Sequence, residues 1–327
     1  MKHNRLCIIG VFFGKLPNYF PLWLKSCAYN KNIDFLMFTD QKIENFPSNF
    51  RLFPYSLDEV REKASKVVGF DVELERAYKL CDYRPIYGYI FEEYLSEYDY
   101  WAHCDFDMIL GDIQAFCEKY KIEKYDRFLP FGHLSFYRNS RQILDRYMLP
   151  AKGFDYSDVF SSKENFIFDE EPGMNYIYKS NNFPFFDKKI MMDIQYYHER
   201  FTQGKMVVSQ KDVVKNFKYQ VFFWSKGKTY RAYFNNDKIF LEECIYIHFK
   251  KRPDFSVDFD LNNVEEFFIT SKGFFQKNGD VCLEDIKKYN PYPGAIYEKY
   301  ETIKFYTVYY FKKLINKIRK NIGIINI

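Results

Sequence analysis

Two aspartates, Asp105 and Asp107, flank a single phenylalanine directly after the aromatic and apolar run 100–104. In an extended segment, residues i and i+2 project to the same side. Two carboxylates brought together at a strand end repel each other unless a cation lies between them. Mg²⁺ and Mn²⁺ take oxygen ligands and commonly bridge carboxylates to substrate phosphates. The Asp-Phe-Asp sequence therefore predicts a site for a divalent cation and a diphosphate. The alternative is a solvated pair of acids.

A basic segment, 78–85, lies upstream of this pair and carries Lys79 and Arg84. If the helix predicted there passes the same edge of the sheet, both cations can meet a diphosphate, and Arg84 can do so through a bidentate fork. The alternative is an ordinary charged helix face.

A late histidine, His248, stands in a strand-like run and is followed by Lys250 and Lys251. Imidazole is a suitable ligand for Mn²⁺, and the two lysines suit phosphate. His248 is therefore a candidate third metal ligand, with Lys250 and Lys251 as candidate donor-binding residues. A purely structural histidine is the alternative.

Two further segments add candidates. The acids Asp169, Glu170 and Glu171 are adjacent, and one of them could act as a general base on an acceptor hydroxyl if their loop folds over a cleft. The alternative is a solvated acidic loop. His133, in the segment 132–139, could line a sugar or acceptor pocket.

The elements needed to position these residues alternate between strands and helices. Apolar runs ending in Gly or polar residues predict strands, and mixed charged runs predict helices. Pro85 is expected to break the longest helix. The predicted strands are 6–14, 33–40, 52–55 and 98–106, and the predicted helices are 22–30, 57–69 and 76–97.

This alternation predicts an α/β fold with a mainly parallel central sheet flanked by helices. In such sheets ligands bind at the carboxyl ends of the strands, where Asp105 and Asp107 would lie. The middle of the chain is less regular, with strand-like runs at 219–224 and 245–249. We expect a catalytic domain over 1–260 and a C-terminal extension over 261–327.

Composition excludes several classes of protein. With 47% hydrophobic residues in 327, the chain can bury a large core, so disorder is not expected. A net charge of +4 is too small to argue for a nucleic-acid partner. The seven cysteines are scattered and odd in number, which is typical of reduced thiols in the cytoplasm. Walker, Gly-x-Ser-x-Gly and Gly-x-Gly-x-x-Gly motifs are all absent from the sequence.

The C-terminal tail, 297–327, interleaves aromatic and aliphatic residues with lysines and arginine. This pattern predicts a basic amphipathic helix. Such a helix could dock on an anionic membrane surface, so the location expected is cytoplasmic and peripheral on the inner face of the membrane. Alternatively, the tail packs on the domain or forms a dimer. No apolar run is long enough for a transmembrane span.

The order of the segments resembles the nucleotide-sugar glycosyltransferases of the GT-A fold, a Rossmann-like α/β fold. The segments 78–82 and 101–112 are also similar to those of bacterial glycosyltransferase-like proteins from polysaccharide gene clusters. The similarity covers roughly residues 5–255 and is specific around 78–139. The His-x-x-Gly-x-x-Lys pattern of one such group is absent, because Phe249-Lys250 follows His248.

The resemblance implies roles for individual residues. Asp105 and Asp107 would hold Mn²⁺ or Mg²⁺ on the donor diphosphate, His248 would match a late metal-binding histidine, and Asp40 would border the nucleotide. The implied activity moves a sugar from a nucleoside-diphosphate sugar, such as a UDP-sugar, to a glycan or lipid-linked acceptor in surface polysaccharide synthesis.

Two other functions stay open from the sequence. A sugar nucleotidyltransferase would share the metal and nucleotide, but it usually carries a Gly-rich basic loop after its first strand, for which the segment 14–17 is a poor substitute. A non-catalytic carbohydrate-binding protein of the same fold is the second.

Overall fold

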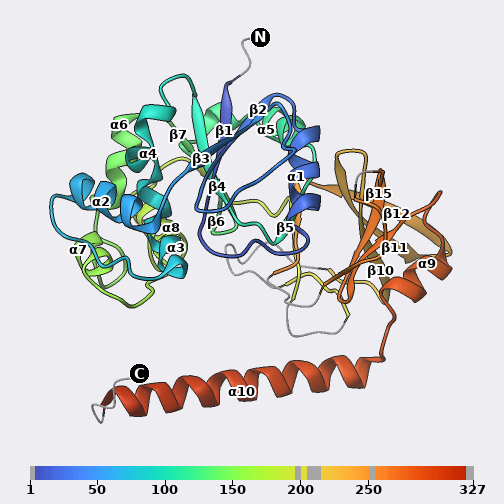
Figure 1. Cartoon of the computed structure of the whole chain (residues 1–327). Coiled ribbons are helices and arrows are strands. Elements are labelled where there is room, and N and C mark those ends of the chain that lie inside the picture. Colours follow the sequence, from blue (N-terminus) through green and yellow to red (C-terminus); the bar gives the residue numbers. More distant parts are fainter. Residues whose placement is uncertain (1–3, 196–199, 205–214, 251–254, 262, 322–327) are drawn as a thin grey trace.

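The structure is a computed structural model that describes residues 4–195, 200–204, 215–250, 255–261 and 263–321. Figure 1 shows an α/β body, a smaller β-rich part packed beside it, and a long C-terminal helix that leaves both. The helices are α1 (Phe20–Tyr29), α2 (Leu57–Val68), α3 (Leu80–Tyr83), α4 (Tyr87–Ile90), α5 (Ile113–Lys119), α6 (Arg141–Leu144), α7 (Tyr156–Phe160), α8 (Met174–Ser180), α9 (Leu283–Tyr289) and α10 (Ala295–Asn321). Short 3-10 turns are η1 (Ala77–Lys79), η2 (Arg84–Ile86), η3 (Glu92–Tyr94), η4 (Ile122–Lys124) and η5 (Asp145–Met148).

The strands of the described residues form three sheets. The first has the order β3-β2-β1-β4-β7-β6-β8, with β1 (Leu6–Phe12), β2 (Ile33–Thr39), β3 (Phe50–Pro54), β4 (Tyr100–Cys104), β6 (Arg127–Phe131), β7 (Leu134–Arg138) and β8 (Phe185–Phe186). The second has the order β12-β11-β10-β15-β16-β14, with β10 (Tyr219–Ser225), β11 (Lys228–Asn235), β12 (Lys238–Cys244), β14 (Ser256–Val257), β15 (Glu266–Thr270) and β16 (Gly273–Gln276). The third joins β5 (Met108–Leu110), β13 (Tyr246–His248) and β9 (Met192–Asp193).

The expectation of one mainly parallel sheet of the GT-A type is wrong, although the class is α/β. Strands β3, β2, β1 and β4 are parallel, but β4 pairs antiparallel with β7, and β7 pairs antiparallel with β6. The second and third sheets also mix the two senses. The physical reason is the turn at Gly132 and His133, because two residues can join only antiparallel neighbours. Strand–helix alternation in the sequence gave no sign of this hairpin.

Both faces of the first sheet are covered, because its central strands are buried almost continuously along their length. Along β1, Leu6 and Ile8 pack into a cluster with α1 and α5, while Cys7 and Ile9 pack into a second cluster with α2, α4 and α8. Helix α2 begins at a capping box in which Ser56 and Glu59 bond reciprocally. The expected helix over 76–97 is a chain of short turns interrupted around Pro85.

The second sheet packs against the body through a separate apolar cluster that includes Phe222, Trp224, Ile109 and Ile247. The indole Nε1 of Trp224 also donates to the carbonyl of Leu110, at 3.1 Å. The expected domain boundary at residue 260 falls within this sheet, since β14 ends at Val257 and β15 begins at Glu266.

Helix α10 runs past the body on the side toward which the carboxyl ends of the parallel strands point (Figure 1). Among the described residues, no helix combines the length and apolarity needed to cross a bilayer.

Candidate functional site

The two aspartates of the Asp-Phe-Asp sequence lie between β4 and β5, where the chain leaves the parallel part of the sheet. Phe106 projects away from them into the core, with its ring centroid 4.8 Å from that of Trp23 and 5.4 Å from that of Phe12. This burial fixes the segment, so Asp105 and Asp107 are held together on the opposite side. The backbone N–H of Asp105 donates to the carbonyl of His133, at 2.9 Å.

Strand pairing brings His248 to the same place. In the antiparallel pair of β13 with β5, His248 faces Met108, and the next residue donates its N–H to the carbonyl of Asp107, at 3.0 Å. Nε2 of His248 then lies 3.3 Å from an oxygen of Asp107 and 4.0 Å from an oxygen of Asp105. Segments far apart in the sequence therefore converge on one point.

The three side chains fit a divalent cation. One ligand atom from each of Asp105, Asp107 and His248 lies within 4.8 Å of the other two. Neighbouring ligands of an octahedral ion with bonds of about 2.1 Å are separated by about 3 Å, so the observed spacings need only small side-chain adjustments. Two carboxylates and one imidazole are suitable donors for Mn²⁺ or Mg²⁺.

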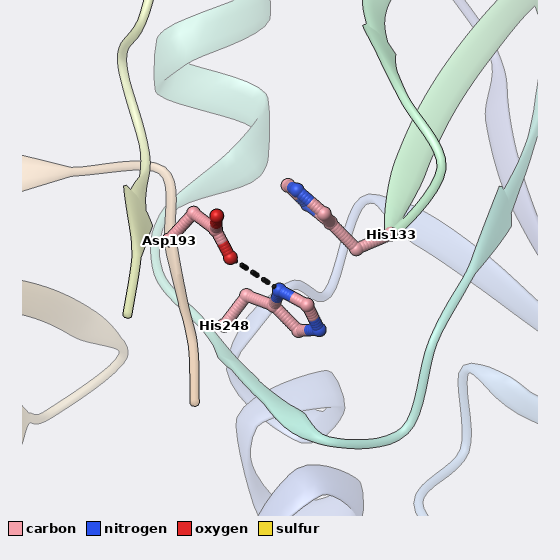
Figure 2. Close-up of side chains that lie close together, drawn as sticks. All are labelled: His133, Asp193 and His248. Carbon is pink, nitrogen blue, oxygen red and sulfur yellow. Dashed lines mark hydrogen bonds and ion pairs between the residues drawn. The ribbon is translucent and has the colours of Figure 1, made fainter. Parts of the chain in front are cut away.

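A third carboxylate, that of Asp193, contacts the other ring nitrogen of His248 (Figure 2). Asp193, the residue paired with His248 in the β9–β13 register, accepts from Nδ1 of that histidine at 2.8 Å. It also lies 3.3 Å from the ammonium of Lys250. A carboxylate on the distal nitrogen of a ligating histidine orients the ring and raises its basicity. The sequence prediction missed Asp193; the signal was a lone acid inside the apolar run 191–194.

Burial and charge together set the protonation of the cluster. Burial lowers the pKa of His248, but Asp107 and Asp193 outweigh it and raise this pKa to about 10. Burial raises the pKa of Asp107, yet the imidazolium brings the net value below the usual range. The pKa of Asp193 falls for the same reason, against its burial. Without a metal, a protonated imidazole thus supplies the positive charge that these carboxylates require.

His133 lies against this cluster. Its ring stacks on that of His248 with centroids 4.3 Å apart, and its Nδ1 is 2.7 Å from the hydroxyl of Tyr246. Burial, followed by the nearby His248 charge, keeps its pKa well below the usual value, so the ring is neutral. Its Nε2 has no hydrogen-bond partner among the described residues. Together with Asp193 and His248, it forms a second group whose ligand atoms lie close enough to hold a metal.

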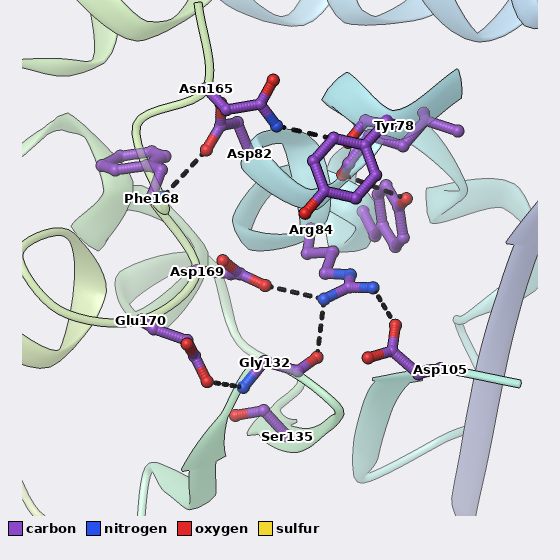
Figure 3. A network of polar contacts seen from close by, with 12 residues as sticks. Tyr78, Asp82, Arg84, Asp105, Gly132, Ser135, Asn165, Phe168, Asp169 and Glu170 are labelled. Atoms are coloured by element: carbon purple, nitrogen blue, oxygen red, sulfur yellow. Dashed lines mark hydrogen bonds and ion pairs between the residues drawn. The ribbon is translucent and has the colours of Figure 1, made fainter. Parts of the chain in front are cut away.

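Arg84 is the centre of a neighbouring polar network (Figure 3). Its guanidinium pairs with Asp105, donates to the carbonyl of Gly132 at 2.7 Å, and pairs with Asp169 at 2.8 Å. Burial raises the pKa of Asp169 to about 7, against the opposing effect of Arg84. Arg84 therefore lies at the site, but its donors hold the protein's own carboxylates and the β6–β7 turn.

The three candidate acids separate in the structure. Asp169 is buried and bound to Arg84, whereas Glu170 is partly buried and accepts from the N–H of Gly132 at 2.5 Å. Glu171 is exposed and lies 3.4 Å from Lys179. The loop thus brings Asp169 and Glu170 to the site and turns Glu171 away.

The remaining candidates do not contact the cluster of Asp105, Asp107 and His248. Lys79 is only 1% exposed, and its ammonium pairs with Asp82 at 2.9 Å. Asp82 also accepts two backbone N–H groups of the loop before Asp169, so this pair fixes that loop. Asp40 is exposed and accepts from the N–H of Gly14 at 3.1 Å. Lys251 lies outside the described residues.

Comparison with known proteins places the chain in a family. The family DUF6625, described as a family of unknown function, matches residues 8–278, which include every residue of the cluster. The chain belongs to this family. No curated protein matches the chain. Membership of DUF6625 assigns no reaction to the chain.

Proposed function

We propose that this chain is a metal-dependent glycosyltransferase that moves a sugar from a nucleoside-diphosphate sugar, with UDP-sugars as the first class to test. As the sequence resemblance implies, the acceptor would be a glycan or a lipid-linked sugar of bacterial surface polysaccharide synthesis. One observation carries the proposal, namely the convergence of Asp105, Asp107 and His248 at a strand end. Oxygen and imidazole donors in this arrangement suit a cation that also binds phosphate oxygens.

A cation bound there would neutralise the charge that develops on the departing nucleoside diphosphate. Arg84 fixes Asp105, and Asp193 orients the His248 ring, so both act as positioning residues. Among the described residues, Lys250 is the lysine beside this cluster, and its ammonium, partly exposed and 3.3 Å from Asp193, could contact phosphate.

The acceptor hydroxyl needs a group that takes its proton. The oxygen of the acceptor hydroxyl forms a bond to the anomeric carbon of the sugar as the bond from that carbon to the diphosphate breaks. Glu170 is the best placed acid for this role, because it is partly buried at the site and its carboxylate accepts from a backbone N–H and pairs with no arginine or lysine among the described residues. Asp169 is engaged by Arg84, and Glu171 faces Lys179.

The test is a thermal-shift screen of nucleotide sugars with and without Mn²⁺. A ligand at 100 times its Kd stabilises a protein by roughly 2.7 kcal/mol. We expect a shift with one nucleotide sugar only when Mn²⁺ is present. Asp107→Asn should abolish the shift, whereas Asp71→Asn, a control at an exposed acid, should preserve it.

The products then separate the candidate functions. Release of a nucleoside diphosphate from the sugar donor supports a glycosyltransferase, and release of pyrophosphate from a nucleoside triphosphate would instead indicate a nucleotidyltransferase. A shift without turnover would favour a carbohydrate-binding protein, and no shift with any nucleotide sugar would refute the proposal. Glu170→Gln should lower kcat and leave the Mn²⁺-dependent shift in place.

A further inference from the structure

Helix α10 presents an apolar face to solvent. At 3.6 residues per turn, six of its large exposed residues fall within an arc of about 100°. They are Ile296, Tyr300, Ile303, Tyr310, Phe311 and Leu314, whose exposed fractions run from 54% to 89%. Contiguous apolar surface of this kind marks an interaction site in a soluble chain.

The base of α10 is anchored, so the helix leaves the body in a defined direction. Arg200, 4% exposed, forms an ion pair with Glu298 in the first turn of the helix. The same guanidinium lies over the ring of Tyr292, at 5.2 Å from its centroid. Figure 1 shows the helix running from this anchor beneath the α/β body.

A basic and aromatic hollow lies at the same base. It has a volume of about 490 Å³, is lined by Lys218, Tyr219, Lys287 and Tyr292, and reaches Gly294, directly before α10. The ammonium of Lys218 lies over both tyrosine rings, at 5.0 and 5.6 Å. No carboxylate of the described residues pairs with Lys218 or Lys287, so both positive charges are available to an anionic partner.

Charge distinguishes between the partners that could cover this face. Within 295–321 the sequence has seven lysines and arginines against two glutamates, which gives a net charge of +5. Two copies of α10 packed together would bring like charges against each other, whereas an anionic bilayer attracts them. Tyrosines mixed with aliphatic residues also suit the boundary between headgroups and acyl chains.

We propose that α10 is an interfacial membrane anchor. Its apolar face lies among the lipids of an anionic bilayer, and Lys218 and Lys287 face the headgroup phosphates. Figure 1 places α10 on the side of the body where the parallel strands end, so the anchor would hold that side, with Asp105, Asp107 and His248, near the bilayer. The inference rests on surface chemistry alone and does not require the proposed sugar transfer.

The experiment is vesicle flotation with the full chain, using vesicles of phosphatidylcholine alone or with phosphatidylglycerol. We expect roughly tenfold or greater preference for the anionic vesicles at about 0.1 M salt, weakening as salt is raised. The triple variant Ile303→Ser, Phe311→Ser, Leu314→Ser should lose roughly tenfold or more of this binding. Leu241→Ser, at a residue 59% exposed on β12, is the control and should bind like the wild type.

A second pair of variants tests the hollow. Lys218→Ser with Lys287→Ser should weaken binding to anionic vesicles by roughly 30-fold, since each lysine near the surface contributes about fivefold. The matched control, Lys31→Ser with Lys152→Ser, removes two exposed lysines elsewhere and should have no such effect. Because all these side chains lie at the surface, the variants should keep the melting temperature of the wild type.

Three results would overturn the proposal. Equal binding to neutral and anionic vesicles would remove the role of charge. Absence of vesicle binding, with a dimer in light scattering that the triple variant dissociates, would identify a second copy as the partner. A monomer that binds no vesicle would show that α10 needs no partner.

Discussion

Replacing Asp193 by asparagine should weaken metal binding without removing any of the three proposed ligands. In the wild type the Asp193 carboxylate lies 2.8 Å from Nδ1 of His248. Asparagine keeps an oxygen that can accept from this nitrogen, but the substitution removes the negative charge. Asp193 is 5% exposed, so water screens this charge little.

The size of the effect follows from the distances. A cation held by Nε2 of His248 would lie about 7 Å from the Asp193 carboxylate, across the ring and one metal–nitrogen bond. At an effective dielectric constant of about 20, a unit charge at that distance attracts a divalent ion by roughly 5 kcal/mol. The charge of the imidazolium ring lies much closer, at about 4 Å, and is attracted by roughly 4 kcal/mol. Because the imidazolium loses its proton when the cation binds, the expected net loss is about 1 kcal/mol, or roughly fivefold in Kd. Outer partners of ligating histidines typically contribute 10- to 100-fold, and the smaller effect expected here reflects the imidazolium that Asp193 also stabilises.

The assay is a titration with Mn²⁺ followed by electron paramagnetic resonance of the free ion, with circular dichroism to confirm folding. Asp126→Asn is the control. Asp126 also pairs with a buried cation, Arg146, at 2.8 Å, but it precedes β6 at the end away from His133. A Kd for Asp193→Asn within about 1.5-fold of the wild type, with Asp126→Asn also unchanged, would refute the reasoning.

Four further outcomes are expected. Mn²⁺ affinity should rise from about pH 7 to 9, because the pKa of His248 is raised to about 10 and the cation must displace its proton. Calorimetry in buffers of different ionisation enthalpy should show that this proton is released. An affinity that does not change with pH would contradict the prediction. In the metal-free protein the same raised pKa stabilises the fold fully below about pH 6.5, so the free energy of unfolding should fall as pH rises toward 10 and should not do so in His248→Gln. Asp82→Ala should lower the free energy of unfolding by about 3–5 kcal/mol in urea, because it leaves the buried Lys79 ammonium unpaired, and a loss below about 1 kcal/mol would show that water reaches it. Gly111→Ala should lower the free energy of unfolding by about 1–3 kcal/mol in the same assay, because a Cβ would lie 2.8 Å from a backbone carbonyl oxygen of the adjoining sheet. An unchanged free energy of unfolding would mean that the two sheets can separate slightly.

Much of the parallel half of the fold was predictable, because its signals are local. Apolar runs gave β1, β2, β3 and β4 to within a few residues, and Pro85 marked the interruption of the helical segment after Arg76. The antiparallel half was not predictable in this way. Its strands depend on which distant segments pair with each other. The hydrophobic pattern of a strand does not indicate which segment it pairs with.

The candidate site divides along the same line. The sequence by itself determined that Asp105 and Asp107 share a side, through their i and i+2 spacing around the apolar Phe106, and this holds although the chain bends at 106 and 107. It also determined the amphipathic pattern of the C-terminal helix, since both features depend only on neighbours in the chain.

Only the tertiary structure decided which other residues join the two aspartates. The register of β13 against β5 and β9 places His248 beside Asp107 and Asp193, and a shift of one residue would turn its ring to the other face. Packing also places Arg84 against Asp105 and buries Lys79 beside Asp82, so both cations pair with carboxylates of the protein. Spacing along a chain fixes which side chains share a face, but burial and strand register decide which faces meet.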